Sequence, residues 1–288
     1  MNSIGHQVVS PRILYFGTQG SFSLPPLLAL LRTEQRVVGL VIPDIAQQSA
    51  PSAGIINLLT TTTNDTIIAR AHTHAIPVCT PSNLPATLEF ELLVVACFPR
   101  RLPQCLLNRA AIAALNIHPS WLPAYRGPAP LFWQLRDGLR EIGVTLHHMT
   151  SRIDAGDILA QTGITLPAGI AGSAADELLA GAGAEMLLAA IRSGDYSGRP
   201  QRGAESYQSW PHADDWSVPT SWPVLHAFNF MRSAAQWNQP FKLMTSPEAL
   251  SARAATDYTH GASSPGAVRA SAAGGHEVGF ADGWLQVC

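Results

Sequence analysis

Three side chains that could carry out acyl transfer lie in two short segments of the sequence. Residues 115–127 read Leu-Asn-Ile-His-Pro-Ser-Trp-Leu-Pro-Ala-Tyr-Arg-Gly, and residues 153–157 read Ile-Asp-Ala-Gly-Asp. Asn116 supplies an amide donor, His118 a ring that titrates near neutral pH, and Asp154 an acid that can orient the ring. Acyl transfer to an amine needs these groups, because a tetrahedral oxyanion must be stabilised and a proton must be moved.

The elements that position these groups are predicted from apolar runs separated by helical stretches. The run 92–98 is continuous rather than alternating, which is typical of a strand buried on both faces. The candidate strands are residues 12–16, 37–42, 92–98, 115–117, 144–149 and 158–166, and the candidate helices are 24–31, 103–113, 130–136, 172–191 and 223–235. Strands that alternate with helices predict an α/β fold with a Rossmann-like, open and mainly parallel sheet.

In such a sheet, ligands bind beyond the carboxyl ends of the strands. Asn116 and His118 lie at the end of the strand 115–117, and Asp154 follows the strand 144–149. Asn116 and His118 occupy alternate positions, so both side chains should face the same way. We therefore expect the three groups to share one crevice.

The run Asn-x-His-Pro-Ser-x-Leu-Pro-x-x-Arg-Gly, followed by Asp-x-Gly-Asp, resembles the formyltetrahydrofolate-dependent formyltransferases. Methionyl-tRNA formyltransferase-like proteins are the most similar branch. The resemblance covers roughly residues 1–195 and is strongest from 92 to 166. It implies the formyltransferase fold, with 10-formyltetrahydrofolate as co-substrate and no metal. It also implies that Asn116, His118 and Asp154 are the catalytic residues.

The same resemblance implies a folate pocket. Residues 97–102 resemble the segment that forms one wall of that pocket, where an apolar surface with exposed backbone amides suits a flat pterin. A simple strand-to-helix connection is the alternative. The predicted cofactor-binding residues are Phe98, Arg100, Arg101, Leu102, Ser120, Leu122, Pro123 and Ile153.

Other polar and glycine-rich positions are predicted to hold loops or to lie near the site. Arg126 and Gly127 are expected to fix the loop that follows His118. His147 and His148 lie on opposite faces of a strand, so one of them should face the site. The Gly-Thr-Gln-Gly run 17–20 lacks the G-x-G-x-x-G spacing, which favours a structural turn over a dinucleotide site.

After residue 200 the composition becomes rich in Trp and Pro, and the following pattern predicts short strands separated by turns. Residues 221–232, 265–266 and 282–285 resemble the small β-barrel domain of methionyl-tRNA formyltransferases. We therefore predict a catalytic domain over residues 1–200 and a smaller C-terminal β-barrel-like domain over 201–288.

The sequence leaves the identity of the formyl acceptor open. The net charge is −2 and Lys242 is the single lysine, so no basic field for general nucleic-acid binding exists. The stretch 43–66, expected to be a loop plus a poor helix, is rich in Ser, Thr and Gln where methionyl-tRNA formyltransferases carry a basic loop. The acceptor is therefore either initiator methionyl-tRNA or a small amine such as an amino sugar.

Two further alternatives remain, a hydrolase that releases formate from the same donor and a non-catalytic folate-binding protein. The apolar runs are far shorter than the roughly 20 residues that span a bilayer. The first residues lack the basic and apolar pattern of a signal peptide. We therefore expect a cytoplasmic protein without a membrane partner, while the oligomeric state is left open.

Overall fold

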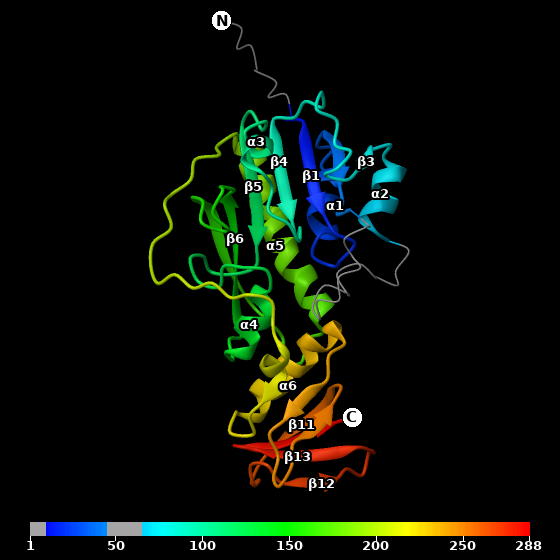
Figure 1. The fold of residues 1–288 in the computed structure, drawn as a ribbon, viewed down its shortest axis with the longest axis vertical. Coiled ribbons are helices and arrows are strands. Elements are labelled where there is room, and N and C mark those ends of the chain that lie inside the picture. Colours follow the sequence, from blue (N-terminus) through cyan, green and yellow to red (C-terminus); the bar gives the residue numbers. More distant parts are fainter. Residues whose placement is uncertain (1–9, 45–64) are drawn as a thin grey trace, which may run out of the picture.

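The computed structural model describes residues 10–44 and 65–288, so most of the expected loop 43–66 lies outside the described residues. Figure 1 shows an elongated molecule with a large sheet at one end and smaller sheets at the other. The arrowheads of the central strands point toward the smaller sheets. The carboxyl edge of the large sheet, where ligands bind in open α/β folds, therefore faces the C-terminal region.

Within the described residues, seven strands form the large sheet in the order β3-β2-β1-β4-β5-β6-β7. Strands β1 to β5 pair in parallel, whereas β6 and β7 are antiparallel to their neighbours. The expected open and mainly parallel sheet is confirmed. The bounds are β1 (Ile13–Gly17), β2 (Val37–Val41), β3 (Val78–Cys79), β4 (Leu92–Ala96), β5 (Ala113–His118), β6 (Glu141–His148) and β7 (Ile158–Thr165).

The central strands are buried on both faces. In β4, Leu92 and Val94 contribute to one apolar core, whereas Leu93 and Val95 contribute to the other. Strand β1 divides its side chains between the two cores in the same alternating way. The continuous apolar run predicted as a doubly buried strand therefore forms one, and both faces of the sheet hold β4 in place.

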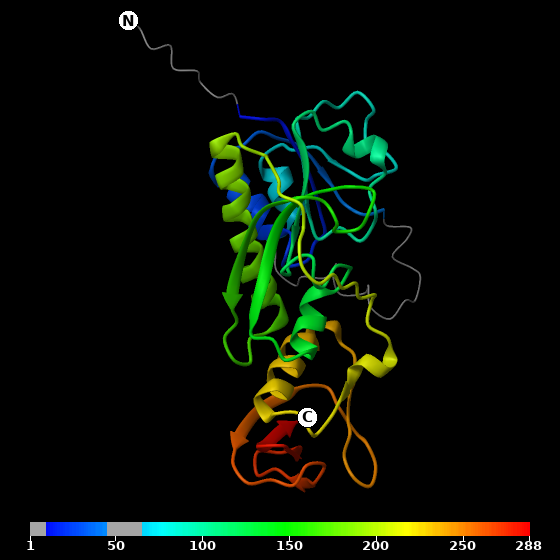
Figure 2. The ribbon, with the colours of Figure 1, turned by 90° about the vertical axis from the view of Figure 1, so that its left-hand side faces the viewer.

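Helices cover both faces of the sheet. Helices α1 and α5 pack against each other on one face, and α3 lies on the other (Figure 2). Helix α5 ends at Gly194, whose φ of 66° is the left-handed conformation that favours glycine at a helix end. The helices are α1 (Leu24–Arg32), α2 (Ile67–Thr73), α3 (Gln104–Leu107), α4 (Pro130–Arg136), α5 (Gly172–Ser193) and α6 (Val224–Ala234).

The helix expected over residues 103–113 is wrong in its length. Helix α3 ends at Leu107, and β5 begins at Ala113. Ala113 and Ala114 pair with Leu92 and Leu93 of β4, so the sheet takes residues whose local propensity favours a helix.

The C-terminal region contains two small sheets joined to the rest of the molecule by α6. A three-stranded sheet has the order β10-β9-β8, and a four-stranded antiparallel sheet has the order β11-β14-β13-β12. The strands are β8 (Ser217–Val218), β9 (Phe241–Leu243), β10 (Leu250–Ala252), β11 (Ala255–His260), β12 (Val268–Ala270), β13 (His276–Phe280) and β14 (Gly283–Val287). A domain division at residue 200 stays a prediction. No helix in residues 10–44 and 65–288 is long and apolar enough to cross a membrane.

An aromatic cluster fastens the C-terminal region to the large sheet. Phe132 of α4 lies 5.1 Å from Trp216, 5.2 Å from Phe230 of α6 and 5.7 Å from Trp237, measured between ring centroids. Trp237 belongs to the short helix η3 (Ala235–Trp237), and Trp216 ends η2 (Ala213–Trp216). Because aromatic rings bury large apolar areas, this cluster makes the two parts one continuous core.

Helix α5 approaches β5 closely at a glycine, and this predicts opposite effects for two substitutions in one helix. A Cβ atom at Gly183 would lie 2.3 Å from Ile117 Cγ2, whereas a Cβ at Gly181 would meet nothing within 4 Å. We expect Gly183→Ala to lower the free energy of unfolding by roughly 1–3 kcal/mol, as overpacking does. Gly181→Ala should raise it by roughly 0.5–1 kcal/mol. Urea unfolding of both variants measures this, and equal effects would contradict the packing described.

Candidate active site

Strand β5 and the loop between β6 and β7 bring the three predicted catalytic side chains together. Asn116 and His118 project from the same side of β5, while Ile117 between them packs against α5. Asp154 lies on the loop that connects β6 and β7. The Asp154 carboxylate thus faces two side chains that belong to an earlier strand of the sequence, β5.

The distances show that the three groups share one small volume. Asp154 Oδ2 lies 3.7 Å from His118 Nδ1, and Asp154 Oδ1 lies 3.5 Å from Asn116 Nδ2. His118 Nε2 lies 2.9 Å from the carbonyl oxygen of Tyr125, so Nε2 must carry a proton to make that hydrogen bond. Nδ1 has no protein partner within hydrogen-bond distance among the described residues, so it is the ring nitrogen that can exchange a proton with a ligand.

The loop that carries Asp154 is held by residues distant in the sequence. Asp154 has a φ of 48°, a left-handed conformation that is costly for a residue with a side chain. The Gly127 amide donates to Asp154 Oδ2 at 3.0 Å, and Gln201 Nε2 donates to the carbonyls of Asp154 and Gly156 at 2.7 and 2.8 Å. These hydrogen bonds fix the backbone conformation that aims the carboxylate at the site.

Arg126 and Gly127 act on this loop through the chain that follows α5. Arg126 Nη2 donates to Gln201 Oε1 at 2.6 Å, and Arg126 Nη1 pairs with Glu205 at 2.7 Å. Gly127 has a φ of 115°, and a Cβ there would lie 2.1 Å from the carbonyl oxygen of Gln208. The Arg-Gly pair, expected to fix the loop after His118, thus connects the Asp154 loop to the chain after α5.

His147 is directly opposite Asn116 in the β5–β6 pairing and orients its amide. His147 Nδ1 donates to the carbonyl of His148 at 2.8 Å, which leaves Nε2 to accept a hydrogen bond from Asn116 Nδ2 at 3.2 Å. Burial of the His147 ring lowers its pKa to about 4, against the opposing attraction of Asp154, so the ring is neutral near pH 7. His148 instead bonds to the carbonyl of Tyr196, away from Asn116.

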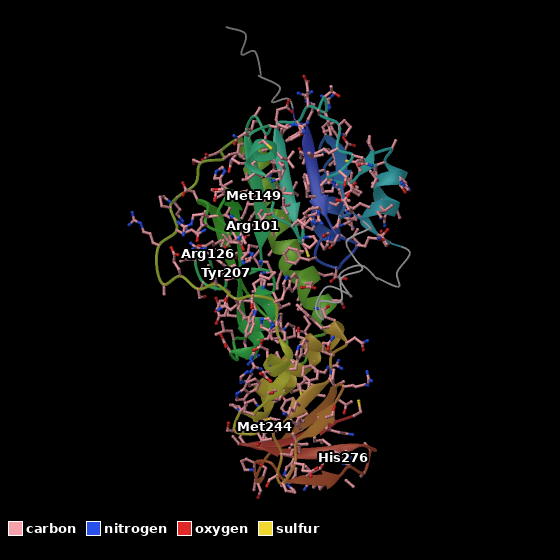
Figure 3. All side chains as sticks on the ribbon, viewed as in Figure 1. Arg101, Arg126, Met149, Tyr207, Met244 and His276 are labelled. Atoms are coloured by element: carbon pink, nitrogen blue, oxygen red, sulfur yellow. The ribbon has the colours of Figure 1, made fainter. Side chains whose placement is uncertain are left out.

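A single cavity of about 740 Å³ contains the three groups and several of the predicted folate contacts. Figure 3 labels Arg101 and Met149, which line this cavity from the segments after β4 and β6. Tyr207, from the chain after α5, lines it as well. The predicted residues found in its lining are Asn116, His118, Asp154, Phe98, Arg100, Arg101, Leu102 and Ile153.

Ser120, Leu122 and Pro123, predicted to contact a folate, lie outside the lining of this cavity. Ser120 is fully buried and its hydroxyl donates to the carbonyl of Ala124 at 2.8 Å. Thr145 Oγ1 donates to the Ser120 carbonyl at 2.6 Å and accepts from the Leu122 amide at 3.3 Å. The loop after His118 is therefore folded against β6 rather than toward the cavity, and a folate contact is not proposed for these three residues.

The turn at residues 17–20 is stabilised by a serine that precedes α1. Ser23 Oγ accepts a hydrogen bond from the Thr18 amide at 2.9 Å and donates to the Ala96 carbonyl at 2.7 Å. This network ties the end of β1 to the end of β4, as a structural turn would. Gly20 nevertheless lines the cavity, so the turn also forms part of its wall.

The sequence gives little signal for the residues that support the site. Gln201 contacts a loop 47 residues earlier in the chain, and no local pattern marks that contact. Strand alternation indicated that one of His147 and His148 faces the site. Which of them does so depends on the β5–β6 register, which places His147 opposite Asn116, and alternation alone does not give that register.

Comparison with known proteins shows what this chain is similar to. The model of the formyl transferase family matches residues 81–191, which include β4, β5 and the Asp154 loop. The methionyl-tRNA formyltransferase of Syntrophus aciditrophicus is 34% identical over 62% of this chain and 57% of its own. That of Pelobacter propionicus is 29% identical over 96% of this chain and 88% of its own. The match thus spans little more than half the length of the first relative.

Solved structures share the fold at low sequence identity. HypX from Aquifex aeolicus, solved with tetrahydrofolic acid, has a TM-score of 0.62 and 18% identity, covering 97% of this chain and 44% of that one. An N-formyltransferase from Helicobacter canadensis, solved with folinic acid and dTDP-3-aminofucose, has a TM-score of 0.64 and 15% identity. It covers 96% of this chain and 98% of that one.

The neutral state of His147 predicts how stability depends on pH. Its pKa is lower in the folded protein than the ordinary value near 6.5 in the unfolded chain. The unfolded state therefore binds more protons as the pH falls below 6.5, and the folded state loses stability toward pH 4. Replacing His147 by Gln, which keeps an acceptor for Asn116 but does not titrate, should remove this loss.

The measurement is urea unfolding of the wild type and His147→Gln at pH 7.5, 6 and 5. From pH 7.5 to pH 5 the wild type should lose on the order of 2 kcal/mol more than the variant does. His276→Gln, at an exposed histidine of β13, serves as the matched control and should follow the wild type. Parallel pH curves for the wild type and His147→Gln would contradict the assignment of a neutral ring.

Proposed function

We propose that this chain transfers a formyl group from 10-formyltetrahydrofolate to a primary amine, because the formyl transferase family model matches residues 81–191 and its relatives are named methionyl-tRNA formyltransferases. The observation that carries the proposal is the convergence of Asn116, His118 and Asp154 in one cavity large enough for a folate. A cytoplasmic location and a reaction without a resident metal ion are parts of the same proposal.

The donor is assigned to the part of the cavity formed by the segments after β4 and β6. Phe98, Leu102 and Ile153 give this part apolar surface for a pterin. Arg100 and Arg152, which also line the cavity, provide cationic groups that suit the glutamate carboxylates of a folate. Arg100 lies 3.7 Å from Asp44, and its side chain remains 40% exposed, so its guanidinium is accessible to a ligand carboxylate.

The proposed reaction follows from the hydrogen bonds of the site. The acceptor nitrogen attacks the formyl carbon, forming a new C–N bond, and the carbonyl oxygen becomes an oxyanion. Asn116 donates one amide hydrogen to His147, and its second, held only at 3.5 Å from Asp154, is available to the oxyanion. His118 Nδ1 takes the proton from the attacking amine and returns it to N10 of the folate as the C–N10 bond breaks.

Asp154 acts in this scheme as a charge partner. When His118 accepts the proton, the carboxylate 3.7 Å away stabilises the imidazolium that forms. The hydrogen bond from His118 Nε2 to the Tyr125 carbonyl keeps Nδ1 turned toward the carboxylate. The acceptor is proposed only as a primary amine, because the relatives carry names for transfer to methionyl-tRNA and one solved neighbour holds an amino sugar nucleotide.

This proposal is tested by following tetrahydrofolate release from 10-formyltetrahydrofolate in the presence of charged initiator tRNA, amino-sugar nucleotides and free amino acids. The wild type should release tetrahydrofolate with at least one of these amines. His118→Ala should reduce the rate by at least a hundredfold, because the proton transfer is lost. His276→Ala, in the C-terminal sheet (Figure 3), should keep the wild-type rate.

Mass spectrometry of the amine identifies the formylated product. Formate release without any amine would assign the protein to the hydrolases instead. Binding of the folate with no turnover for any amine would show a folate-binding protein without this activity.

A further inference from the structure

The cavity has a second wall that the donor assignment leaves unused. It is formed by the turn after β1, the first turns of α5 and the end of α6, all of which reach the carboxyl edge of the sheet. Helices α5 and α6 meet closely there, since a Cβ at Gly172 would lie 2.2 Å from the carbonyl oxygen of Ser233. The polar residues of this wall are Ser21, Ser173, Asp176, Ser233, Gln236 and Gln239.

Asp176 places a carboxylate in this wall without a cationic partner. Ser21 Oγ donates to Asp176 Oδ2 at 3.1 Å, and Gln236 Nε2 donates to the same oxygen at 3.4 Å. Asp176 Oδ1 accepts no hydrogen bond from the described residues, and none of their Arg, Lys or His side chains forms an ion pair with Asp176. The side chain is partly accessible, and it lines the cavity.

The described surroundings leave one oxygen of the Asp176 carboxylate without a hydrogen-bond donor. Burial raises the pKa of Asp176 to about 6, and the hydrogen bonds from Ser21 and Gln236 oppose this shift. The group is therefore mostly charged at neutral pH. A charged group with one unused oxygen beside a cavity is stabilised by a ligand that donates a hydrogen bond to it.

Ser233 supplies a second and independent unpaired group. Its side chain is 2% exposed, it lines the cavity, and its hydroxyl has no hydrogen-bond partner in the described structure. A buried hydroxyl without a partner is uncommon in folded proteins. Ser233 and Asp176 thus belong to the lining of the same cavity, as does Gln236, which donates to Asp176.

Aromatic rings lie beside these polar residues. Trp237 follows Gln236 in the chain, and its ring centroid lies 5.9 Å from that of Trp210. Both side chains line the cavity and are partly exposed. The negative face of an indole ring attracts the weakly positive C–H groups of a saturated ring.

We propose that Asp176, Ser233 and Trp237 form the acceptor-recognition wall of the cavity and select a small amine that carries hydroxyl groups, as an amino sugar does. This inference rests on the proposed function, because it names the class of amine that accepts the formyl group.

The chemistry of the wall separates a hydroxylated acceptor from the side chain of methionine. A hydroxylated ligand can donate to Asp176 Oδ1 from one oxygen and accept from Ser233 at another, because each hydroxyl both donates and accepts. The thioether of methionine has no hydrogen to donate and accepts only weakly, which leaves both atoms unpaired in the complex. A second ammonium group could serve Asp176 but could not accept the hydrogen bond from Ser233.

The experiment measures steady-state kinetics with 10-formyltetrahydrofolate and a defined set of acceptors. The hydroxylated acceptors are D-glucosamine, D-galactosamine and dTDP-3-aminofucose, and the others are initiator methionyl-tRNA and L-methionine. The wild type should formylate at least one amino sugar with a higher kcat/KM than either methionyl compound.

The variants are Asp176→Asn and Ser233→Ala, with Glu177→Gln as an exposed acidic control on the same helix. Asp176→Asn should raise the KM for the amino sugar at least tenfold, and Ser233→Ala at least threefold. Both should keep the KM for 10-formyltetrahydrofolate within twofold of the wild-type value. That split distinguishes recognition from a general structural effect, which would alter both KM values. Glu177→Gln should leave both unchanged.

Two results would overturn this inference while the proposed function stands. One is a higher kcat/KM for methionyl-tRNA than for every amino sugar. The other is an amino-sugar KM that is unchanged in Asp176→Asn. If the wild type releases no tetrahydrofolate with any amine in the set, the proposed function itself fails and the inference fails with it.

Discussion

The position of the Asp154 carboxylate is the constraint on which the rest of the site depends. Its left-handed backbone is unfavourable for a residue with a side chain, so the surrounding chain must hold it. The Gly127 amide binds the carboxylate and Gln201 binds the backbone on either side. With these hydrogen bonds in place, one carboxylate lies within 3.7 Å of His118 and 3.5 Å of Asn116. The His118 imidazole is in turn oriented by its hydrogen bond to the Tyr125 carbonyl, and the Asn116 amide by its hydrogen bond to His147.

The sheet makes this arrangement rigid because both faces of its centre are covered. Strand β5 lies next to β4, which is packed into two apolar cores, and Ile117 rests against Gly183 of α5. Asn116 and His118 are therefore attached to a strand that cannot shift without disturbing the helix beneath it. The aromatic cluster around Phe132 then extends the same core into the C-terminal region. Its member Trp237 lines the cavity, so one set of contacts joins the two parts and shapes the site.

Features with a local cause were predictable from the sequence, and features set by distant contacts were not. The run 92–98 and the helix ended by Gly194 carry their own signals, an unbroken apolar stretch and a glycine at a helix end. Residues 108–112 are helical in composition but lie in turns, because the chain there enters β5, whose Ala113 pairs with Leu92 of β4. Spacing and resemblance together indicated the Asn116, His118 and Asp154 set. The direction of the loop after His118 has no local signal, because Thr145, on another strand, holds it through hydrogen bonds to Ser120 and Leu122.

The chain between α5 and the C-terminal sheets runs along the outside of the large sheet (Figure 1) and carries Gln201 and Glu205. A boundary drawn at residue 200 would separate Arg126 and the Asp154 loop from both of these partners. A protein truncated at residue 200 would keep Asn116, His118 and Asp154. It would lose Gln201 and Glu205, whose contacts hold Arg126 and the Asp154 loop. The connecting segment is thus part of the structure that positions Asp154 beside His118.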